Sequence, residues 1–168
     1  RSLVGSEMCI RDSPSPYSAI SSIALEPLYL SLEPWTVPGL EERVFNETED
    51  TPPWEQPSGP DLVDYPKVRS WKMWILRGAW HNFRTKPEYA GIMPKFREWV
   101  KEQGSWLEDF VCFQVLCDLF GTAIWWHWPE QDPARAKAIA SDYEEEKDFS
   151  RWLQWLLSLI HISEPTRL

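Results

Sequence analysis

Apolar side chains recur every three or four residues along several stretches of the chain, which is the spacing of amphipathic helices. The first such helix is predicted over Asp64 to Phe83, with Asp64 as its N-cap and Pro66 tolerated in the first turn. Lys72 falls on the polar side, which favours a solvated lysine over a catalytic amine. The apolar stripe consists of Val68, Trp71, Ile75, Ala79 and Phe83.

A helical hairpin is predicted next, Pro94 to Gln103 and then Ser105 to Phe120, with a break at Gly104. We expect Ser105 to cap the second helix and Glu108 to complete a capping box. Its buried stripe is expected to be Trp106, Phe110, Phe113, Cys117 and Phe120, with Leu107, Val111 and Leu116 on the flank.

A last helix is expected from its N-cap Asp132, through Pro133, to about Leu157. The three consecutive acids at 144–146 would form its solvated middle. Its end would be buried through Phe149, Trp152, Leu153 and Leu156.

The part of the chain before these helices has shorter-range order. Ile20 to Leu32 ends in alternating leucines, which indicates a short half-buried strand or extended segment. Residues 33–60 contain six prolines and an acidic run, which predicts a surface loop with one helical turn near Gly39 to Val44. Trp35 and Trp54 are expected to pin this loop to the body rather than to serve as sugar platforms.

Composition narrows the classes of function. The chain has 168 residues, 43% of them hydrophobic, which is enough for a folded domain with a core. A net charge of -9 argues against nucleic acid and anionic membranes as partners, and no apolar run reaches the roughly 18 residues of a membrane span. Cys9, Cys112 and Cys117 form no disulfide framework, so we expect a cytoplasmic protein, or a plastid one if the source is algal or plant.

The two ends do not continue the pattern of their neighbours. Residues 1–13 and 158–168 resemble translated sequencing-adapter read-through, and Glu7, Arg11 and Asp12 interrupt any signal-peptide core. We therefore expect native sequence only over 14–157, as a fragment of a longer protein. Its expected parts are a loop and short strand at 14–32, the Pro-rich loop at 33–60 and a helical subdomain at 61–157.

Few residues suggest a chemistry by themselves. His127 lies among tryptophans without a second ligand at metal spacing, which favours a structural role. Glu108 and Asp109 lie in a first helical turn, where the helix dipole explains them better than glycoside hydrolysis does. Ser15 and Tyr17 flank a stiff proline, which suits a polyhydroxylated ligand, although an ordinary proline turn has the same residues.

Four separated segments place that turn in a context. They are Ser15-Pro16-Tyr17 with the residues up to Leu32; Val63-Asp64-Tyr65 with the helix carrying Lys72; Trp106 to Phe110 with Phe113; and Trp125 to Pro129 followed by Phe149, Gln154, Trp155 and Leu156. In this order they resemble the amylomaltases, the 4-alpha-glucanotransferases of glycoside hydrolase family 77. The chain departs from that family at Glu26, where Asn or Asp is usual, and in the Pro-rich insert at 47–60.

The resemblance implies a (β/α)8 barrel that transfers segments of α-1,4-glucans with retention, acts on maltooligosaccharides and needs no metal or organic cofactor. The catalytic carboxylates of the family would lie beyond Leu157, so we expect no catalytic residue in this chain and no activity from it alone. What carries over is substrate binding: Ser15 and Tyr17 match the family's donor-side contacts.

Taken by itself, the chain is expected to be mainly α, a helical subdomain fragment of a TIM-barrel glucanotransferase with little or no regular sheet. The alternative is a self-contained, non-catalytic Trp-rich helical module that binds carbohydrate or protein. Such a module would unfold in one cooperative transition, whereas a piece of a barrel would expose apolar patches and aggregate.

Overall fold

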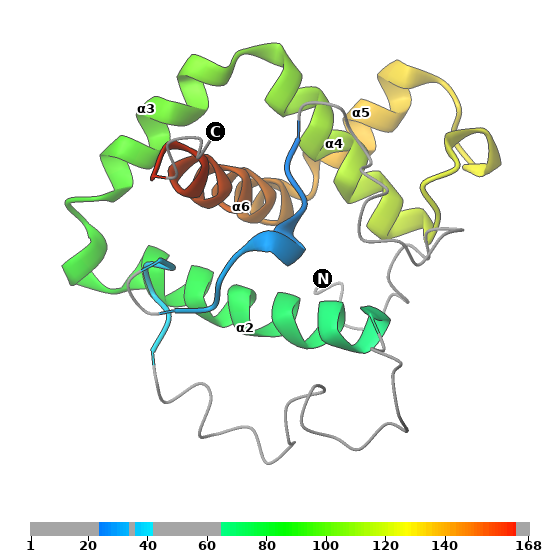
Figure 1. Ribbon diagram of the computed structural model, residues 1–168. Helices are drawn as coiled ribbons and strands as arrows, with labels where there is room; N and C mark the ends of the chain where they lie inside the picture. Colours follow the sequence, from blue (N-terminus) through cyan, green and yellow to red (C-terminus); the bar gives the residue numbers. More distant parts are fainter. Residues whose placement is uncertain (1–23, 34–35, 42–64, 164–168) are drawn as a thin grey trace, which may run out of the picture.

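The computed structural model describes residues 24–33, 36–41 and 65–163, and within these ranges it is helical and has no strand (Figure 1). The mainly α fold with little or no sheet is therefore confirmed. The helices are α2 (Tyr65–Thr85), α3 (Met93–Gln103), α4 (Ser105–Phe120), α5 (Pro133–Ser141) and α6 (Glu144–Ser163), and the 3-10 turns are η1 (Pro27–Tyr29), η2 (Pro87–Tyr89) and η3 (Trp125–His127).

Helix α6 is the centre of the fold. It packs against α2, α3, α4 and η1, which surround it in the ribbon view (Figure 1). Every residue from 151 to 157 is buried. Because seven consecutive helical residues point in all directions, such a run requires neighbours on every side of the helix.

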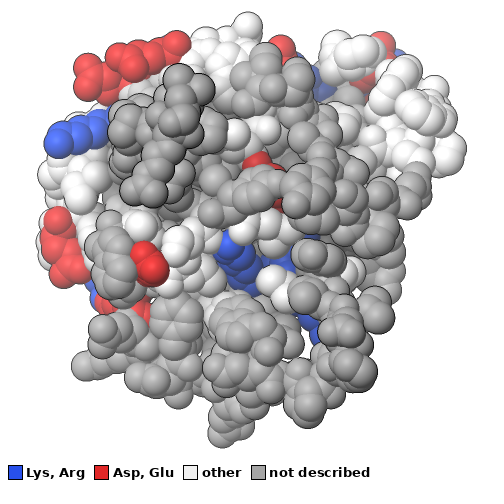
Figure 2. Space-filling model, in the orientation of Figure 1, with Lys and Arg blue, Asp and Glu red and all other residues white. Residues whose placement is uncertain are grey.

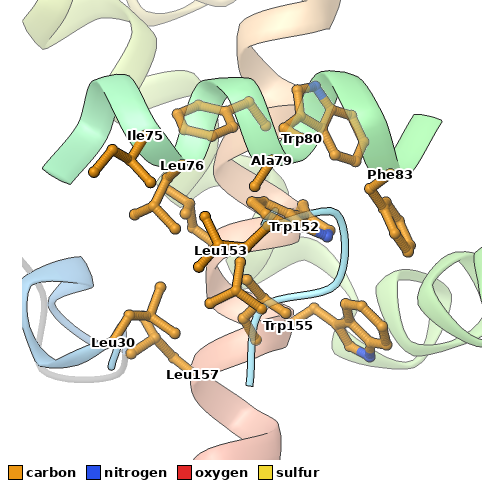
Figure 3. Close-up of a cluster of buried hydrophobic side chains, with 14 of the residues drawn as sticks. Leu30, Ile75, Leu76, Ala79, Trp80, Phe83, Trp152, Leu153, Trp155 and Leu157 are labelled. Atoms are coloured by element: carbon orange, nitrogen blue, oxygen red, sulfur yellow. The ribbon is translucent and has the colours of Figure 1, made fainter. Parts of the chain in front are cut away.

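The main core lies between α6 and α2. Trp152 and Leu153 of α6 approach Leu76, Ala79 and Trp80 of α2, while Leu30, from the segment after η1, meets Leu157 (Figure 3). The Trp152 ring lies 5.5 Å from that of Trp80, between ring centroids. Stacked and tilted aromatic rings at this spacing contribute beyond the area that they bury.

A second, smaller core joins α4, α5 and the turn at η3. Trp128 is buried there, and its indole Nε1 donates to the Thr122 carbonyl at 2.8 Å. Cys112 and Cys117 are both buried there, and neither belongs to a disulfide among the described residues. The cluster consists of Cys112, Val115, Leu116, Cys117, Trp128, Ala136 and Ala140.

The predicted boundaries of the first three helices are confirmed to within two residues. Helix α2 carries its predicted stripe inward, since Ile75, Ala79 and Phe83 are buried. Asp132 caps α5 as predicted, accepting a hydrogen bond from the Arg135 backbone nitrogen at 2.9 Å. The predicted cap of α2, Asp64, lies outside the described residues.

The single long helix predicted from Asp132 to Leu157 is wrong, because the chain turns between α5 and α6. The amides of Asp142 and Tyr143 donate to the carbonyls of Ile139 and Ala140, closing a turn. The acids at 144–146 are therefore the first turn of α6 and not a solvated middle, a position that the helix dipole favours. The turn lets α5 pack on α4 while α6 enters the main core.

Two further predictions about local structure need correction. The alternating leucines form no strand, because residues 27–29 make the 3-10 turn η1, closed by the Leu30 amide on the Pro27 carbonyl. The other form that the pattern predicts, an extended segment, is found at Glu26 and Leu30 on either side of this turn. On α4, only Cys117 of the predicted stripe is buried, because α5 and α6 both pack on a helix that is apolar on nearly every side. The buried residues of α4 are Leu107, Val111, Cys112, Val115, Leu116 and Cys117.

The predicted capping box is also absent. Ser105 is the first helical residue. The N-cap is Gly104, which has no side chain that could accept a capping hydrogen bond. Glu108 instead pairs with Lys147 and Arg151 of α6. No helix in the described ranges combines the length and apolarity that crossing a membrane requires.

The described part of the loop before α2 turns at residues 36–39, earlier than the turn predicted near Gly39 to Val44. The Leu40 amide donates to the Val37 carbonyl at 3.1 Å, and both side chains are buried in the main core. The remainder of the predicted turn, from residue 42 onward, lies outside the described residues, as does most of the Pro-rich loop.

Candidate functional site

The predicted substrate contacts, Ser15 and Tyr17, lie outside the described residues, as do Trp35 and Trp54. The described chain begins at Ala24, seven residues after Tyr17. The assignment of Ser15 and Tyr17 to substrate binding therefore stays a prediction. We call residues 24–30 the anchor segment.

Gln154 of α6 holds the first part of the anchor segment. Its side-chain Nε2 donates to the Leu25 carbonyl at 2.8 Å, and its Oε1 accepts from the Leu25 amide at 2.9 Å. Gln154 is only 4% exposed, and both bonds are partly buried. The side-chain amide thus satisfies both backbone groups of one residue, as a neighbouring strand would.

Glu26 is also buried, at 8% exposed, and its carboxylate pairs with the guanidinium of Arg69 on α2. A buried carboxylate is stable only when it is paired, and α2 supplies the partner. The burial of the Glu26 carboxylate is therefore compensated by an ion pair between two elements of the fold.

Lys72 is not the solvated lysine that its place on the polar side predicts. It is half-buried, and its Nζ donates to the Leu28 carbonyl of η1 at 2.6 Å. Burial lowers the pKa of Lys72 to about 8, an effect that the nearby charge of Glu26 partly offsets. At neutral pH the ammonium group therefore remains mostly charged while it holds the anchor segment.

A further carboxylate, Asp118 of α4, feels the same basic face of α2. Burial raises the pKa of Asp118, and the charges of Arg77 and Arg69 oppose that rise. The space-filling view shows basic side chains near the centre of the face, with acidic side chains both close to them and at the edges (Figure 2). The part of α2 facing η1 and α4 is thus a charged surface.

Glu108 and Asp109, which the sequence does not favour as catalytic acids, form ion pairs with basic side chains of the fold. Glu108 bridges Lys147 and Arg151 of α6, with oxygen to nitrogen distances of 2.5 and 2.6 Å. Arg151 also contacts Glu144 and Asp148, and Asp109 pairs with Lys137 at 3.2 Å. The ion pairs across α4 and α6 explain Glu108 better than the helix dipole invoked from the sequence.

This network makes the stability of the fold depend on pH. Burial alone would raise the pKa of Glu108, but hydrogen bonds and charges from Lys147 and Arg151 lower it to about 2, from an ordinary 4.5. The ionised carboxylate therefore stabilises the fold above about pH 4.5, and this contribution is lost as the pH falls toward 2. We expect Glu108→Gln to lower the free energy of unfolding at pH 7 by about 1 kcal/mol, a modest value because the side chain is 36% exposed.

The measurement is urea unfolding of wild type and Glu108→Gln between pH 7 and pH 3. The variant should lose less stability on acidification than wild type does. Glu102→Gln, at an exposed position on α3, is the matched control and should follow wild type. Equal pH dependence in wild type and Glu108→Gln would contradict the prediction.

The aromatic cluster at 124–130 has both buried and exposed members. Trp125 and Trp126 are 53% and 57% exposed, whereas Trp128 is 7% exposed. His127 is exposed, and its ring packs edge-on against Trp126 with centroids 6.0 Å apart. Among the described residues, no group of three His, Cys, Asp or Glu side chains could hold a metal ion.

The sequence did not predict that the side chains of Lys72 and Gln154 form hydrogen bonds with the backbone of the anchor segment. Their partners are backbone atoms 44 and 129 residues away, which no local pattern encodes. One signal was present: Glu26 stands in an apolar stretch, so a buried carboxylate there needed a cation from elsewhere in the fold.

Comparison with known proteins adds a family to this geometry. A family model described as 4-alpha-glucanotransferase matches residues 4–159. The matched range contains α2 to α5 and most of α6. It begins before Pro14 and ends after Leu157, so the limits of the native sequence stay a prediction.

Curated relatives match over most of this chain but at low identity. The 4-alpha-glucanotransferase of Synechocystis sp. is 28% identical over 149 residues, which are 84% of this chain and 28% of that protein. The 4-alpha-glucanotransferase of Clostridium butyricum is 24% identical over 140 residues, 82% of this chain and 27% of that protein. The chain thus spans about a quarter of the length of these relatives, and no solved structure matches it significantly.

Proposed function

The chain belongs to the 4-alpha-glucanotransferase family, glycoside hydrolase family 77, and on that basis we propose that it is part of an enzyme that transfers α-1,4-glucan segments to another glucan or to glucose. The observation that carries this proposal is the extent of the family match, which includes the Ser15-Pro16-Tyr17 turn, the anchor segment and the helices that hold it. The proposal includes a (β/α)8 barrel, formed with parts of the enzyme outside this chain.

In the proposed reaction, an aspartate attacks the anomeric carbon of the donor glucan while a glutamate protonates the leaving oxygen. The same glutamate then removes the proton from the acceptor's 4-hydroxyl, which displaces the aspartate and restores the original configuration. We assign both carboxylates to parts of the parent enzyme outside this chain, so the chain alone should be inactive. In support, two of the half-buried acids of the described helices, Glu108 and Asp148, are already paired with Lys or Arg.

This chain would contribute one wall of the donor site. Ser15 would donate or accept a hydroxyl hydrogen bond, and Tyr17 would pack against a sugar ring and use its phenol for a second bond. For Ser15 and Tyr17 to keep one position, the anchor segment that follows them in the chain has to be held in place. The contacts of Gln154, Arg69 and Lys72 with residues 25–28 support this requirement.

The test of the proposed function is to recover the longer reading frame, express the full enzyme and incubate it with maltotriose. Transfer should yield glucose together with maltooligosaccharides longer than the substrate. Hydrolysis without longer products would contradict the proposal, and so would a reading frame that stops soon after Leu157.

Tyr17→Ala in the full enzyme should lower kcat/KM for maltotriose about fivefold or more, since one lost hydrogen bond or packing contact is worth about 1 kcal/mol. Tyr17→Phe keeps the ring and should lose only the part due to the phenol. Ser15→Ala should give a similar loss through its hydroxyl. Kinetics like those of wild type in Tyr17→Ala would remove Tyr17 from the site.

The alternative, a Trp-rich binding module without chemistry, is favoured by one observation. Trp74, Trp125 and Trp126 are more than half exposed, at 55%, 53% and 57%. Exposed aromatic faces of this size suit a sugar ring or a protein partner. A single sharp unfolding transition of the soluble, monomeric 14–157 fragment would support the module over the enzyme fragment.

A further inference from the structure

The 3-10 turn η3 presents two exposed tryptophans, Trp125 and Trp126, from a hydrogen-bonded backbone. The turn is closed by the Trp128 amide, which donates to the Trp125 carbonyl at 3.1 Å. The Trp126 carbonyl accepts a hydrogen bond from the Gln131 side chain at 3.0 Å. In the ribbon view this segment lies at the edge of the molecule, just before α5 (Figure 1).

Trp128, at the end of the turn, fastens it to the smaller core. It is 7% exposed, and its ring lies 5.5 Å from that of Phe113 and 5.6 Å from that of Phe120, between centroids. Its indole also donates to the Thr122 carbonyl. Because this anchor and the backbone bonds already order the turn, binding to its two exposed rings requires little further loss of chain entropy.

The rings of Trp125 and Trp126 form an angled pair. They are 53% and 57% exposed, their centroids are 5.9 Å apart, and their planes meet at 86°. A flat indole packs well against the C–H face of a pyranose. The α-1,4 linkage turns each glucose unit relative to the one before it, so successive units face in different directions. Two angled rings therefore suit this curved chain better than a flat β-1,4-glucan.

The segment that carries the two rings lacks Asp, Glu, Lys and Arg over residues 121–129. The next residue, Glu130, accepts from the Asp132 amide at 3.0 Å and lies 3.9 Å from Arg135. The two rings expose an area on the order of 200–300 Å². A standard protein interface needs roughly 800 Å² from each partner. Charge and size together favour a few units of a neutral sugar chain over a protein partner.

We propose that Trp125 and Trp126 form a binding site for an α-1,4-glucan, in which the two indoles pack against neighbouring glucose units. The choice of ligand rests on the proposed function. His127 is exposed beside the pair, with its ring centroid 6.0 Å from that of Trp126, and its ring nitrogens can form hydrogen bonds with sugar hydroxyls.

The experiment is affinity electrophoresis of the full-length enzyme in native gels with and without amylose. The double variant Trp125→Ala/Trp126→Ala should raise the dissociation constant for amylose about tenfold or more, because both stacking surfaces are lost. Trp125→Phe/Trp126→Phe keeps aromatic rings and should retain most of the binding. Trp74→Ala, which removes a similarly exposed indole from α2, is the matched control and should bind amylose as wild type does.

A second comparison separates stacking on sugar from a general apolar contact. Trp125→Leu/Trp126→Leu keeps apolar side chains without rings, so it should bind amylose as weakly as the double alanine variant. If the alanine variant does not accumulate as soluble enzyme, the leucine and phenylalanine variants test the proposal by themselves. In gels that contain a β-1,4-glucan, hydroxyethyl cellulose, the wild-type enzyme should be retarded less than in amylose gels.

Three results overturn the proposal. The first is wild-type retardation of the double alanine variant by amylose, as expected if other parts of the enzyme cover the two rings. The second is equal retardation of the leucine and phenylalanine variants. The third is retardation of the wild-type enzyme by hydroxyethyl cellulose as strong as that by amylose.

This proposal and the proposed function fail separately. If the full-length enzyme transfers glucan segments while its double alanine variant binds amylose like wild type, the function stands and the site is wrong. If the enzyme transfers no glucan but binds amylose through Trp125 and Trp126, the site stands and the proposed function is wrong.

Discussion

Gly39→Ala is expected to destabilise the chain by roughly 3 kcal/mol or more, which is a large share of the stability of an ordinary domain. Gly39 has φ of 90°, a backbone conformation that side chains other than that of glycine rarely adopt. A Cβ atom added there would lie 2.1 Å from the Ala79 carbonyl oxygen and 2.9 Å from the Phe83 nitrogen. Both are backbone atoms of α2, so no side-chain rotation relieves the overlap.

The loop would have to lift from α2, and that movement has identifiable costs. The Asn82 side chain donates to the Gly39 carbonyl at 3.0 Å, and this bond would be broken. Val37 and Leu40, which flank Gly39, are 0% and 4% exposed and would be drawn toward water. The lost burial adds to the strain of the new backbone conformation.

Urea unfolding followed by tryptophan fluorescence measures this loss. Gly78→Ala is the matched control, because nothing lies within 4 Å of a Cβ added at Gly78 in the middle of α2. That substitution should raise stability by about 0.5–1 kcal/mol, the helix preference of alanine over glycine. A Gly39→Ala protein as stable as wild type would show that the loop does not pack on α2 as described.

Local signals in the sequence predict most of the helices. The boundaries of α2, α3 and α4 follow from apolar spacing and from the break at Gly104, both of which depend on neighbouring residues. Which face of α4 is buried does not follow, because that helix is apolar on nearly all sides and its neighbours come from later in the chain. The turn between Ser141 and Glu144 was missed for a related reason: helical spacing continues through it, and only the packing of α5 on α4 separates the two helices.

The candidate site, like the fold, can be predicted from the sequence only in part. The likeness of the Ser15-Pro16-Tyr17 turn and three later segments to amylomaltases pointed to the family, which the family match confirms. The residues that hold the anchor segment could not be found by pattern, since Lys72 looks like any lysine on the polar side of an amphipathic helix. What distinguishes it is a backbone carbonyl 44 residues earlier, which the fold brings to 2.6 Å from its Nζ.

Trp152→Ala is expected to lower the free energy of unfolding by about 3–5 kcal/mol, the usual cost of removing a large buried aromatic side chain. Trp152 is 0% exposed, and its ring contacts those of Trp80, Phe83 and Phe149 at centroid distances of 5.5, 5.9 and 6.3 Å. These neighbours come from α2 and from α6 itself. They belong to two packed helices, so they cannot all collapse into the space left by the indole.

Two further variants separate the volume of this side chain from its chemistry. In the described structure the Trp152 Nε1 is buried without a hydrogen-bond partner, so Trp152→Phe removes an unsatisfied donor along with part of the packing and should cost less than about 1.5 kcal/mol. Trp126→Ala, at 57% exposure, should change stability by no more than about 0.5 kcal/mol. Urea unfolding of the three variants should therefore rank them as Trp126→Ala, Trp152→Phe and Trp152→Ala in increasing loss. An equal loss at positions 126 and 152 would be incompatible with a core organised around α6, because only one of the two indoles is enclosed by it.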